Sequence, residues 1–514
     1  MTIKETVSIW GMLILLSIIL YSQNYNESPR GRHQSGMSNY FAVTLRFIDS
    51  GFNLSTPKTY CLNPQYSANS GKSYGYWNYS PKDPQGITAI DFPIHQYIIA
   101  LIMKTLDSND YSIYRLYMLI ISLFGLYYLG KAVHLFTNSF TFSIVLVCSI
   151  FLSPTFSFFA NNYLISPAAL SFIFIAFYHF RKSFYNKRNY YYFLAFLTIS
   201  ALTRFPFIII IIAYILNEII DGTLNKKIEL KKLSLSLVSL SVVIAYFVYN
   251  KLHLSYNFGS IFLSSPNTVK NSYELLQSLI RIITHKSWYY GTIIHYLFLA
   301  FIAITAIKKI NTFKGNLLKN VKLRFLCIAT MGTFIYSILM IRQFAYHDYY
   351  ILDTYIPITV FWIVAAHQIL DIKKLKQYKR SIILLMFLML ILNIITTKFD
   401  AYYRSDKPQE LNRLKFENAF QTLDSLKISK NAKLLILDAT GSNSPLLSFR
   451  RKGYSIVSDK HQQTSLENLS DWKYDYIITQ NFTYKDTVLS SYPNFEKETT
   501  IFFTNDKFTI HTKK

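Results

Sequence analysis

Residues Tyr191–Ile219 read YYFLAFLTISAL-TR-FPFIIIIIAYILNEI, which is two apolar runs separated by the polar pair Thr203-Arg204. Each run approaches the length that a helix needs to cross about 30 Å of hydrocarbon. We expect two membrane-spanning helices here, joined by a very tight turn. The stretch therefore predicts a helical membrane protein.

Similar apolar runs recur along the chain and predict a polytopic α-helical membrane protein with about eleven spans. The first run could instead be a signal peptide, but no small-residue cleavage site follows it, which favours an uncleaved span. We expect the spans at Val7–Tyr21, Ile113–Leu129, Phe140–Leu152, Leu164–Phe180, Tyr191–Leu202, Phe205–Ile219, Leu233–Tyr249, Tyr289–Ile307, Phe325–Ile341, Tyr350–Leu370 and Ile382–Ile395.

The composition agrees with a membrane protein. Hydrophobic residues make up 51% of the 514 residues and charged residues only 16%, whereas soluble proteins carry about 25% charged residues. A chain this apolar is not disordered. The net charge of +25 would suit a nucleic-acid binder, but the apolar composition argues against that class, and we expect no nucleic-acid partner.

The positions of the basic residues predict how the chain crosses the membrane. Lys and Arg collect in short loops on the cytoplasmic side, and here they fill alternate loops. The opposite short loops contain few, chiefly Arg204 and Arg342. We therefore expect a multi-pass protein of the cytoplasmic (inner) membrane, with its N-terminus in the cytoplasm and the long loops 22–111 and 250–288 outside. The basic loops lie near 131, 181–188, 226–232, 308–324 and 373–380.

The chain divides into two parts. Residues 1–397 contain the spans and both long outer loops, and residues 398–514 have the composition of a water-soluble domain, which we expect in the periplasm. Short apolar runs there predict a small α/β domain. Its turn Ala439-Thr-Gly-Ser-Asn-Ser lacks a GxGxxG pattern, which favours an ordinary polar loop over an anion cradle. The strands are expected at Lys433–Leu437, Tyr454–Val457 and Tyr474–Ile478, and a helix at Ala419–Leu426.

Two segments of the first outer loop are candidates for function. Gln34–Ile48, followed by Gly51-Phe-Asn-Leu, predicts a helix on or near the membrane surface, with a plain connecting helix as the alternative. Asp91-Phe-Pro-Ile-His-Gln-Tyr begins another apolar run. Asp91 at this boundary is either an acid that stabilises the start of a helix or a general base.

Two more candidates lie at the outer ends of spans. Arg204 is a lone basic residue in its turn and needs a partner such as a lipid phosphate, with snorkelling to ordinary headgroups as the alternative. The stretch Arg342-Gln-Phe-Ala-Tyr-His347-Asp348-Tyr349-Tyr350, with Asp353 close behind, gathers polar groups where they are candidates for function. An aromatic belt explains the tyrosines but not the His-Asp pair. If these groups converge, they surround a polar cavity suited to a phosphorylated lipid.

In their order and shared face, these motifs resemble the GT-C superfamily of integral-membrane glycosyltransferases. The likeness is to the branch of dolichyl-phosphate-mannose-protein mannosyltransferases and the aminoarabinose transferase of lipid A, over residues 1–400. The matching stretches are His33-Gln-Ser-Gly-Met-Ser through Gly51-Phe-Asn-Leu, Asp91-Phe-Pro93 for a Glu-x-Pro step, Thr203-Arg204 for a Thr-Lys/Arg turn, and His347-Asp348-Tyr349-Tyr350 for a His-x-Tyr-Tyr step.

The resemblance implies an inverting transfer of a sugar from a polyprenyl-phosphate donor to a glycan, lipid or protein acceptor at the outer membrane face. It implies that Arg204 and His347 bind the donor phosphate, and that Asp91 lies beside the acceptor or beside the base. We assign catalysis to Asp91 and Asp348, the lipid phosphate to Arg204, His347, Tyr349, Tyr350 and Arg342, and the donor and acceptor cavity to His95, Gln96 and Gln34.

The sequence also departs from the family pattern. Family members usually carry an acid in the first loop, where this chain has Gly36. They carry a second acid where this chain has Ser166, in Asn162-Tyr-Leu-Ile-Ser166-Pro. Asp91, Asp348 or Asp83 could replace them, but a divalent metal held by carboxylates becomes doubtful. No CxxC or Cys/His cluster is present, so we assign no metal ligand and no other cofactor.

Other functions fit a similar scaffold. A binder or flippase of lipid-linked sugars should show internal repeats and polar residues deep in both halves of its spans, and we find no repeat. A polymerase or ligase of surface polysaccharide would share the outer cavity but carry different loop residues. A membrane glycosyltransferase, with membrane lipids around it and a polyprenyl-phosphate sugar as its partner, is the leading hypothesis.

Overall fold

The computed structural model describes residues 1–63, 85–262, 268–308, 320–354, 379–405, 407–439, 441–457, 472–482 and 484–514. Contacts divide the chain into two units. The first consists of Met1–Tyr25, Arg115–Phe247 and Pro266–Phe399, and the second consists of Asn26–Tyr114, Val248–Ser265 and Asp400–Lys514.

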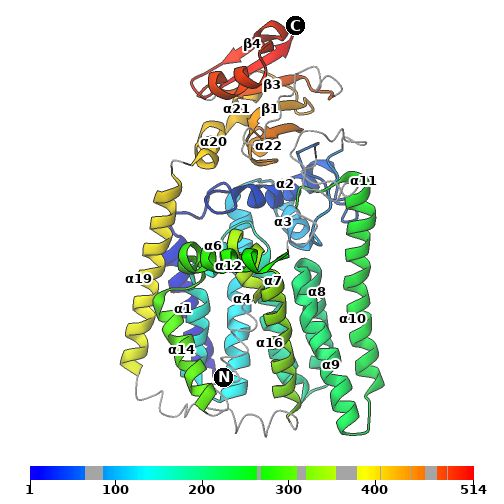
Figure 1. Ribbon diagram of the computed structural model, residues 1–514, viewed down its shortest axis with the longest axis vertical. Helices are drawn as coiled ribbons and strands as arrows, with labels where there is room; N and C mark the ends of the chain where they lie inside the picture. The colour runs from blue at the N-terminus through cyan, green and yellow to red at the C-terminus, as the bar shows by residue number, and fades with distance from the viewer. Residues whose placement is uncertain are drawn as a thin grey trace. The chain divides into compact units, whose positions relative to one another are not determined.

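The described part of the first unit is helical and contains no strand. Its long helices run side by side, and the short helix α12 lies across the direction of α14 and α16 (Figure 1). The helices are α1 (Ile3–Tyr21), α4 (Tyr111–Thr137), α5 (Phe140–Phe151), α6 (Pro154–Ala160), α7 (Ser166–Ser183), α8 (Arg188–Thr203), η2 (Phe205–Phe207), α9 (Ile208–Leu224), α10 (Leu230–Val248), α12 (Ser272–Arg281), η4 (Ile282–Lys286), α13 (Ser287–Tyr290), α14 (Ile293–Lys308), α16 (Val321–Leu339), α17 (Ile341–Tyr346) and α19 (Lys379–Arg404). Three of these helices, α4, α10 and α19, continue for one to five residues past the bounds of the unit.

The helical hairpin predicted around Thr203-Arg204 is present. α8 ends at Thr203 because Arg204 takes an extended conformation, with φ −141° and ψ 104°. Pro206 stands in the first turn of the next helical segment, where its missing N–H leaves no hydrogen bond unmade. Phe205 stacks on Phe247 of α10, with ring centroids 4.4 Å apart. The turn thus fixes Arg204 at the end of two packed helices.

Among the described residues, six helices are long and apolar enough to cross a membrane. A seventh span results if α5 and α6 count as one, although they are bent by 74° at their junction. Shorter helices occupy other predicted positions, including α7, α8 and α14. The predicted span Tyr350–Leu370 lies mostly outside the described residues, which stop at 354 in this region. The number of about eleven spans stays a prediction.

The second unit combines short helices with one sheet. The strands are β1 (Leu434–Ala439), β2 (Gly453–Val457), β3 (Tyr476–Gln480), β4 (Thr499–Thr504) and β5 (Phe508–Lys513), in the order β2-β1-β3-β5-β4. β1 pairs in parallel with β2 and β3, and β5 pairs antiparallel with β3 and β4. The helices are α2 (Gln34–Ser50), α3 (Ile94–Thr105), η3 (Tyr249–Ser255), α11 (Tyr256–Phe258), α20 (Pro408–Phe416), α21 (Ala419–Ser425), α22 (Ser444–Phe449), η8 (Tyr484–Leu489) and α23 (Phe495–Glu498).

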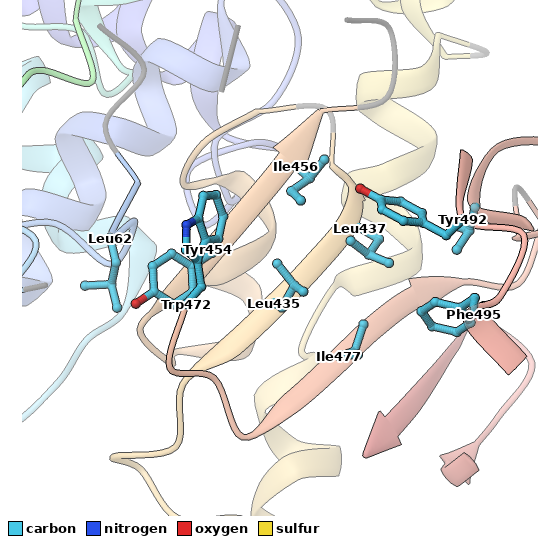
Figure 2. Packing of buried hydrophobic residues seen from close by; sticks show 10 residues of the cluster. Leu62, Leu435, Leu437, Tyr454, Ile456, Trp472, Ile477, Tyr492 and Phe495 are labelled. Atoms are coloured by element: carbon cyan, nitrogen blue, oxygen red, sulfur yellow. The ribbon is translucent and has the colours of Figure 1, made fainter. Parts of the chain in front are cut away.

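One face of the sheet holds an apolar core. Leu435 and Leu437 of β1 pack there with Ile477 of β3, and Leu62 of the first loop joins the same cluster. Figure 2 shows Leu62 beside Tyr454 and Trp472. The three predicted strands and the predicted helix at 419–426 are confirmed. The sequence does not predict β4 and β5. Most side chains of β4 are exposed, so it lacks a buried apolar face. β5 does have buried side chains, from Phe508 to His511, but polar and apolar residues are mixed among them.

Candidate active site

Arg204 and Asp353 form a buried ion pair in the first unit. The Nε atom of Arg204 donates to Oδ1 of Asp353 at 3.3 Å, and its Nη2 atom donates to Oδ2. The two side chains are 9% and 0% exposed. A guanidinium that meets both carboxylate oxygens has a fixed orientation. The anionic partner that the lone arginine was expected to need is therefore a carboxylate of this chain.

Three rings that follow α17 form a cluster at the Arg204 end of this ion pair. The Arg204 guanidinium lies 5.2 Å from the ring centroid of Tyr350 and 5.8 Å from that of Tyr349, within the range of cation–π attraction. The two tyrosine rings stack at 4.7 Å, and the His347 ring lies 5.6 Å from Tyr349. The structure therefore brings together four predicted residues, because Arg204, His347, Tyr349 and Tyr350 form one cluster, in which Arg204 also binds Asp353.

The end of α17 sets the position of these rings. α17 ends at Tyr346, and His347 takes an extended conformation with φ −126° and ψ 92°. The Tyr290 hydroxyl donates to the carbonyl oxygen of Phe344 at 2.5 Å, which holds the last turn of α17. Asp348, which stands between His347 and Tyr349 in the sequence, is fully buried. The segment thus carries a second buried acid next to the ion pair in sequence.

Arg342 has a different environment. Its Nη1 atom lies 3.5 Å from Oε1 of Glu274 on α12, and the two side chains are 32% and 26% exposed. On the same side of α12, the guanidinium of Arg281 lies over the ring of Tyr346 at 4.2 Å. Arg342 therefore joins α17 to α12 through a partly exposed ion pair.

Asp91 belongs to the second unit and accepts a hydrogen bond from α2. The Tyr40 hydroxyl donates to Oδ2 of Asp91 at 3.3 Å. α3 begins at Ile94 with Pro93 as its N-cap, and no side chain caps it. Asp91 is therefore not the N-cap residue of α3, and its interaction with the helix dipole stays a prediction. Its carboxylate is oriented by the Tyr40 hydroxyl.

The helix predicted at Gln34–Ile48 is confirmed as α2, but its side chains from Met37 to Phe47 are all buried. These side chains are covered by protein, which favours the alternative of a connecting helix over one that contacts lipid. Contacts along α2 and α3 follow chain order, since Tyr40 meets Asp91 and Phe47 packs on Tyr97 at 5.6 Å. The two helices run in the same direction.

The polar side chains predicted for the cavity lie at two places along these helices. His95 and Gln96 are buried at the start of α3, and Gln96 is 0% exposed with neither side-chain amide atom hydrogen bonded to the described residues. Burial lowers the pKa of His95 to about 4, so its ring is neutral at pH 7. Gln34 precedes Tyr40 by six residues, about 9 Å along a helix, on the side away from Gln96. The structure does not bring Gln34 next to the other two.

No family model matches the chain, and no curated protein matches it in sequence. Solved structures do resemble it along its full length. ArnT from Cupriavidus metallidurans superposes with a TM-score of 0.59 in its apo state, over 98% of this chain and 97% of ArnT at 10% identity, and its complex with undecaprenyl phosphate gives the same TM-score at 9% identity. The chain has the GT-C fold. An oligosaccharyltransferase from Archaeoglobus fulgidus, tethered to an acceptor peptide, superposes with a TM-score of 0.52 over 99% of this chain and 74% of its own at 11% identity.

The GT-C likeness confirms the predicted fold class, a polytopic helical membrane protein with a small C-terminal sheet. The two departures from the GT-C pattern can now be located. Gly36 lies in the first turn of α2, and Ser166 is the buried first residue of α7. Within the described part of the chain, no three His, Cys, Asp or Glu side chains gather as a metal site would require.

Sequence reasoning missed the partners of several buried charges. Asp353 received no role, although it orients Arg204. Arg115, at the start of α4, is 6% exposed and donates from Nε to Asn161 Oδ1 at 3.4 Å. The sequence does mark Arg115 as a candidate, because it is a single arginine that interrupts an apolar run at the end of a span. Arg32 meets Asp400 at 3.4 Å, and a pair so far apart in sequence leaves no local signal.

Proposed function

We propose that the chain is a membrane glycosyltransferase that moves a sugar from a polyprenyl-phosphate donor to an acceptor on the outer face of the membrane. The GT-C fold over nearly the whole chain supports this proposal, and so does the similarity to a protein solved with undecaprenyl phosphate. The proposed acceptor is a glycan, a lipid or a protein.

The observation that carries the proposal is the buried Arg204 guanidinium beside the Tyr349 and Tyr350 rings. A buried arginine is a strong site for phosphate because its planar fork matches two phosphate oxygens. Asp353 holds the fork in place before the donor arrives, and the donor phosphate then competes with the carboxylate for it. A guanidinium that is already oriented in this way stabilises the negative charge that develops on the departing phosphate.

In the proposed reaction the oxygen of the acceptor hydroxyl attacks the anomeric carbon. The bond from this carbon to the phosphate oxygen breaks, and its electron pair stays on the phosphate. The configuration inverts because attack and departure occur on opposite faces. A carboxylate takes the proton of the acceptor hydroxyl. We assign the role of this base to Asp91, which Tyr40 holds by a hydrogen bond. Asp348 is the alternative base.

The test is a transfer assay in membranes with a panel of polyprenyl-phosphate sugars. Arg204→Ala should lower transfer at least about a hundredfold, since an oriented charge on the leaving group contributes two to three powers of ten. Arg324→Ala is the matched control. Arg324 is also a buried arginine paired with an acid, Asp221, at 2.6 Å, and it contacts the far end of the same helix α9.

The assay also separates the alternatives. Loss of transfer in Arg204→Ala with retention in Arg324→Ala supports the proposal. If Asp91→Asn keeps full activity and Asp348→Asn loses it, the base is Asp348. If no donor supports transfer but a labelled lipid-linked sugar crosses the membrane in proteoliposomes, the protein is a transporter and the enzyme proposal is wrong.

A further inference from the structure

The C-terminal sheet holds a segment of the first outer loop at its edge. The backbone N–H of Leu62 donates to the Gly453 carbonyl at 2.7 Å, and the N–H of Gly453 donates to the Tyr60 carbonyl at 3.0 Å. Gly453 begins β2, the strand at one edge of the sheet. Asn63 adds two more bonds at 3.0 Å: its Nδ2 atom donates to the Ser455 carbonyl oxygen, and its Oδ1 atom accepts from the Ser455 N–H. Residues 59–63 therefore bind the sheet much as an added strand would.

Asn443 connects this segment to α2. It lies in the polar turn between β1 and α22 and is 0% exposed. Its Oδ1 atom accepts from the Thr59 hydroxyl at 2.5 Å and from the Cys61 N–H at 2.9 Å. Its Nδ2 atom donates to Oδ1 of Asn39 at 2.9 Å. The polar loop expected from the sequence is thus a junction that holds the first loop and α2 together.

Asn39 and Tyr40 extend the junction to Asp91. Asn39 also donates to the Ile261 carbonyl at 3.3 Å, so the second outer loop joins the same point. The next residue, Tyr40, packs on Phe262 at 4.7 Å and donates its hydroxyl to Asp91. The path from the sheet to the carboxylate is therefore short: Asn443, Asn39, Tyr40, Asp91.

We propose that the C-terminal sheet positions Asp91 for proton transfer, with Asn443 and Asn39 as positioning residues that act through Tyr40. The inference rests on the proposed function, because it assigns the sheet a role in that reaction. This role does not require the sheet to bind a ligand. Catalytic groups must be held to within about 1 Å, since a displacement of that size can cost a hundredfold in rate.

The chain contains a natural reporter for this junction. Cys61 is buried between the loop and the sheet, and burial raises the pKa of its thiol to about 12. The thiol is therefore protected from reagents that need the thiolate. The other two cysteines lie in α5 and α16. A membrane-impermeant maleimide, with Cys61→Ser to assign the signal, reports release of the loop independently of activity.

The experiment compares three variants of the full chain in membranes. Asn443→Ala should expose Cys61 to the maleimide and lower kcat at least about tenfold, with the KM for the donor unchanged. Asn39→Ala should lower kcat equally while Cys61 stays protected, because it breaks only the link to α2. Asn505→Ala is the control, since Asn505 Oδ1 accepts two backbone N–H groups at 2.8 Å in the β4–β5 turn of the same sheet. It should leave labelling and kcat unchanged.

The failures are distinguishable. If Asn443→Ala leaves Cys61 protected, or exposes it without lowering kcat, the sheet does not position Asp91. If Asn505→Ala lowers kcat as much as Asn443→Ala, the effect is one of domain stability and the inference is overturned. If Asp91→Asn keeps wild-type transfer, the base has been misassigned and the inference falls with it, whereas Cys61 labelling still measures the junction.

Discussion

Arg204 reaches both carboxylate oxygens of Asp353 across 149 residues of sequence, and the pair is almost completely buried. Such a pair adds little to stability compared with apolar residues of similar size. Removing one partner is costly, because the other charge is then buried alone. The pair therefore makes the stability and the proposed chemistry separable by mutation.

Arg204→Met alone should destabilise the protein by about 3–5 kcal/mol, because Asp353 loses its guanidinium partner. The double variant Arg204→Met/Asp353→Leu should recover most of the lost stability. Neither variant should transfer sugar. Thermal unfolding in detergent micelles measures the first two effects. A double variant that is stable and fully active would show that Arg204 has no role beyond packing.

Glu274→Gln should release Arg342. A partly exposed ion pair contributes up to about 1 kcal/mol, so the KM for the donor should fall roughly twofold to fivefold if Arg342 binds the phosphate. The gain should shrink as salt is raised, because exposed charges are screened. An unchanged KM in both salt conditions would remove Arg342 from the donor site.

Gly125→Ala should loosen the packing of α4 against α7. A methyl group at Gly125 would lie 2.5 Å from Cα of Ser171 and 2.3 Å from its Cβ, so the helices must separate, at a cost of about 1–3 kcal/mol. Gly11→Ala in α1 is the control, because nothing lies within 4 Å of the added carbon. It should be neutral or stabilise by up to about 1 kcal/mol. Melting temperatures that shift equally in both variants would contradict this account.

The second unit should lose stability as the pH falls from 6.5 toward 4. His511 is 3% exposed and pairs with the Thr479 hydroxyl at 3.0 Å, and burial lowers its pKa from 6.5 to about 4. The folded state therefore favours the neutral ring, while the unfolded chain takes up the proton near 6.5. The stability gained by keeping the His511 ring neutral is therefore fully present above pH 6.5, and it is lost as the pH falls from 6.5 to about 4.

His511→Phe should flatten this pH dependence, because the ring can no longer be protonated. Unfolding of the full chain by urea, followed by fluorescence between pH 7.5 and 4.5, measures it in both proteins. Identical pH profiles would assign the acid sensitivity to other groups.

Most of the helices could be predicted because a membrane leaves few alternatives. Backbone groups in hydrocarbon must be satisfied within the helix, so a long apolar run has one outcome. Helix ends could not be predicted so well. α4 extends to Thr137, past the expected end at Leu129, because a helix continues beyond the apolar run that reveals it.

The candidate site could be predicted only in part. Arg204 and the His347–Tyr350 step stand out because charge at membrane depth is rare. The partnership with Asp353, and the junction at Asn443, depend on residues distant in sequence. Neutral asparagines in a polar turn carry no local signal of what they bind, which is why the turn was expected to be an ordinary loop.

The junction at Asn443 also constrains the order of events during biosynthesis. Thr59 and Asn443 are 384 residues apart, and ribosomes add about 5–20 residues per second. The first loop must therefore wait roughly 20–80 s for its partner, while the intervening helices are inserted. The proposed base would therefore reach its final position only after Asn443 has been made, long after the first loop itself.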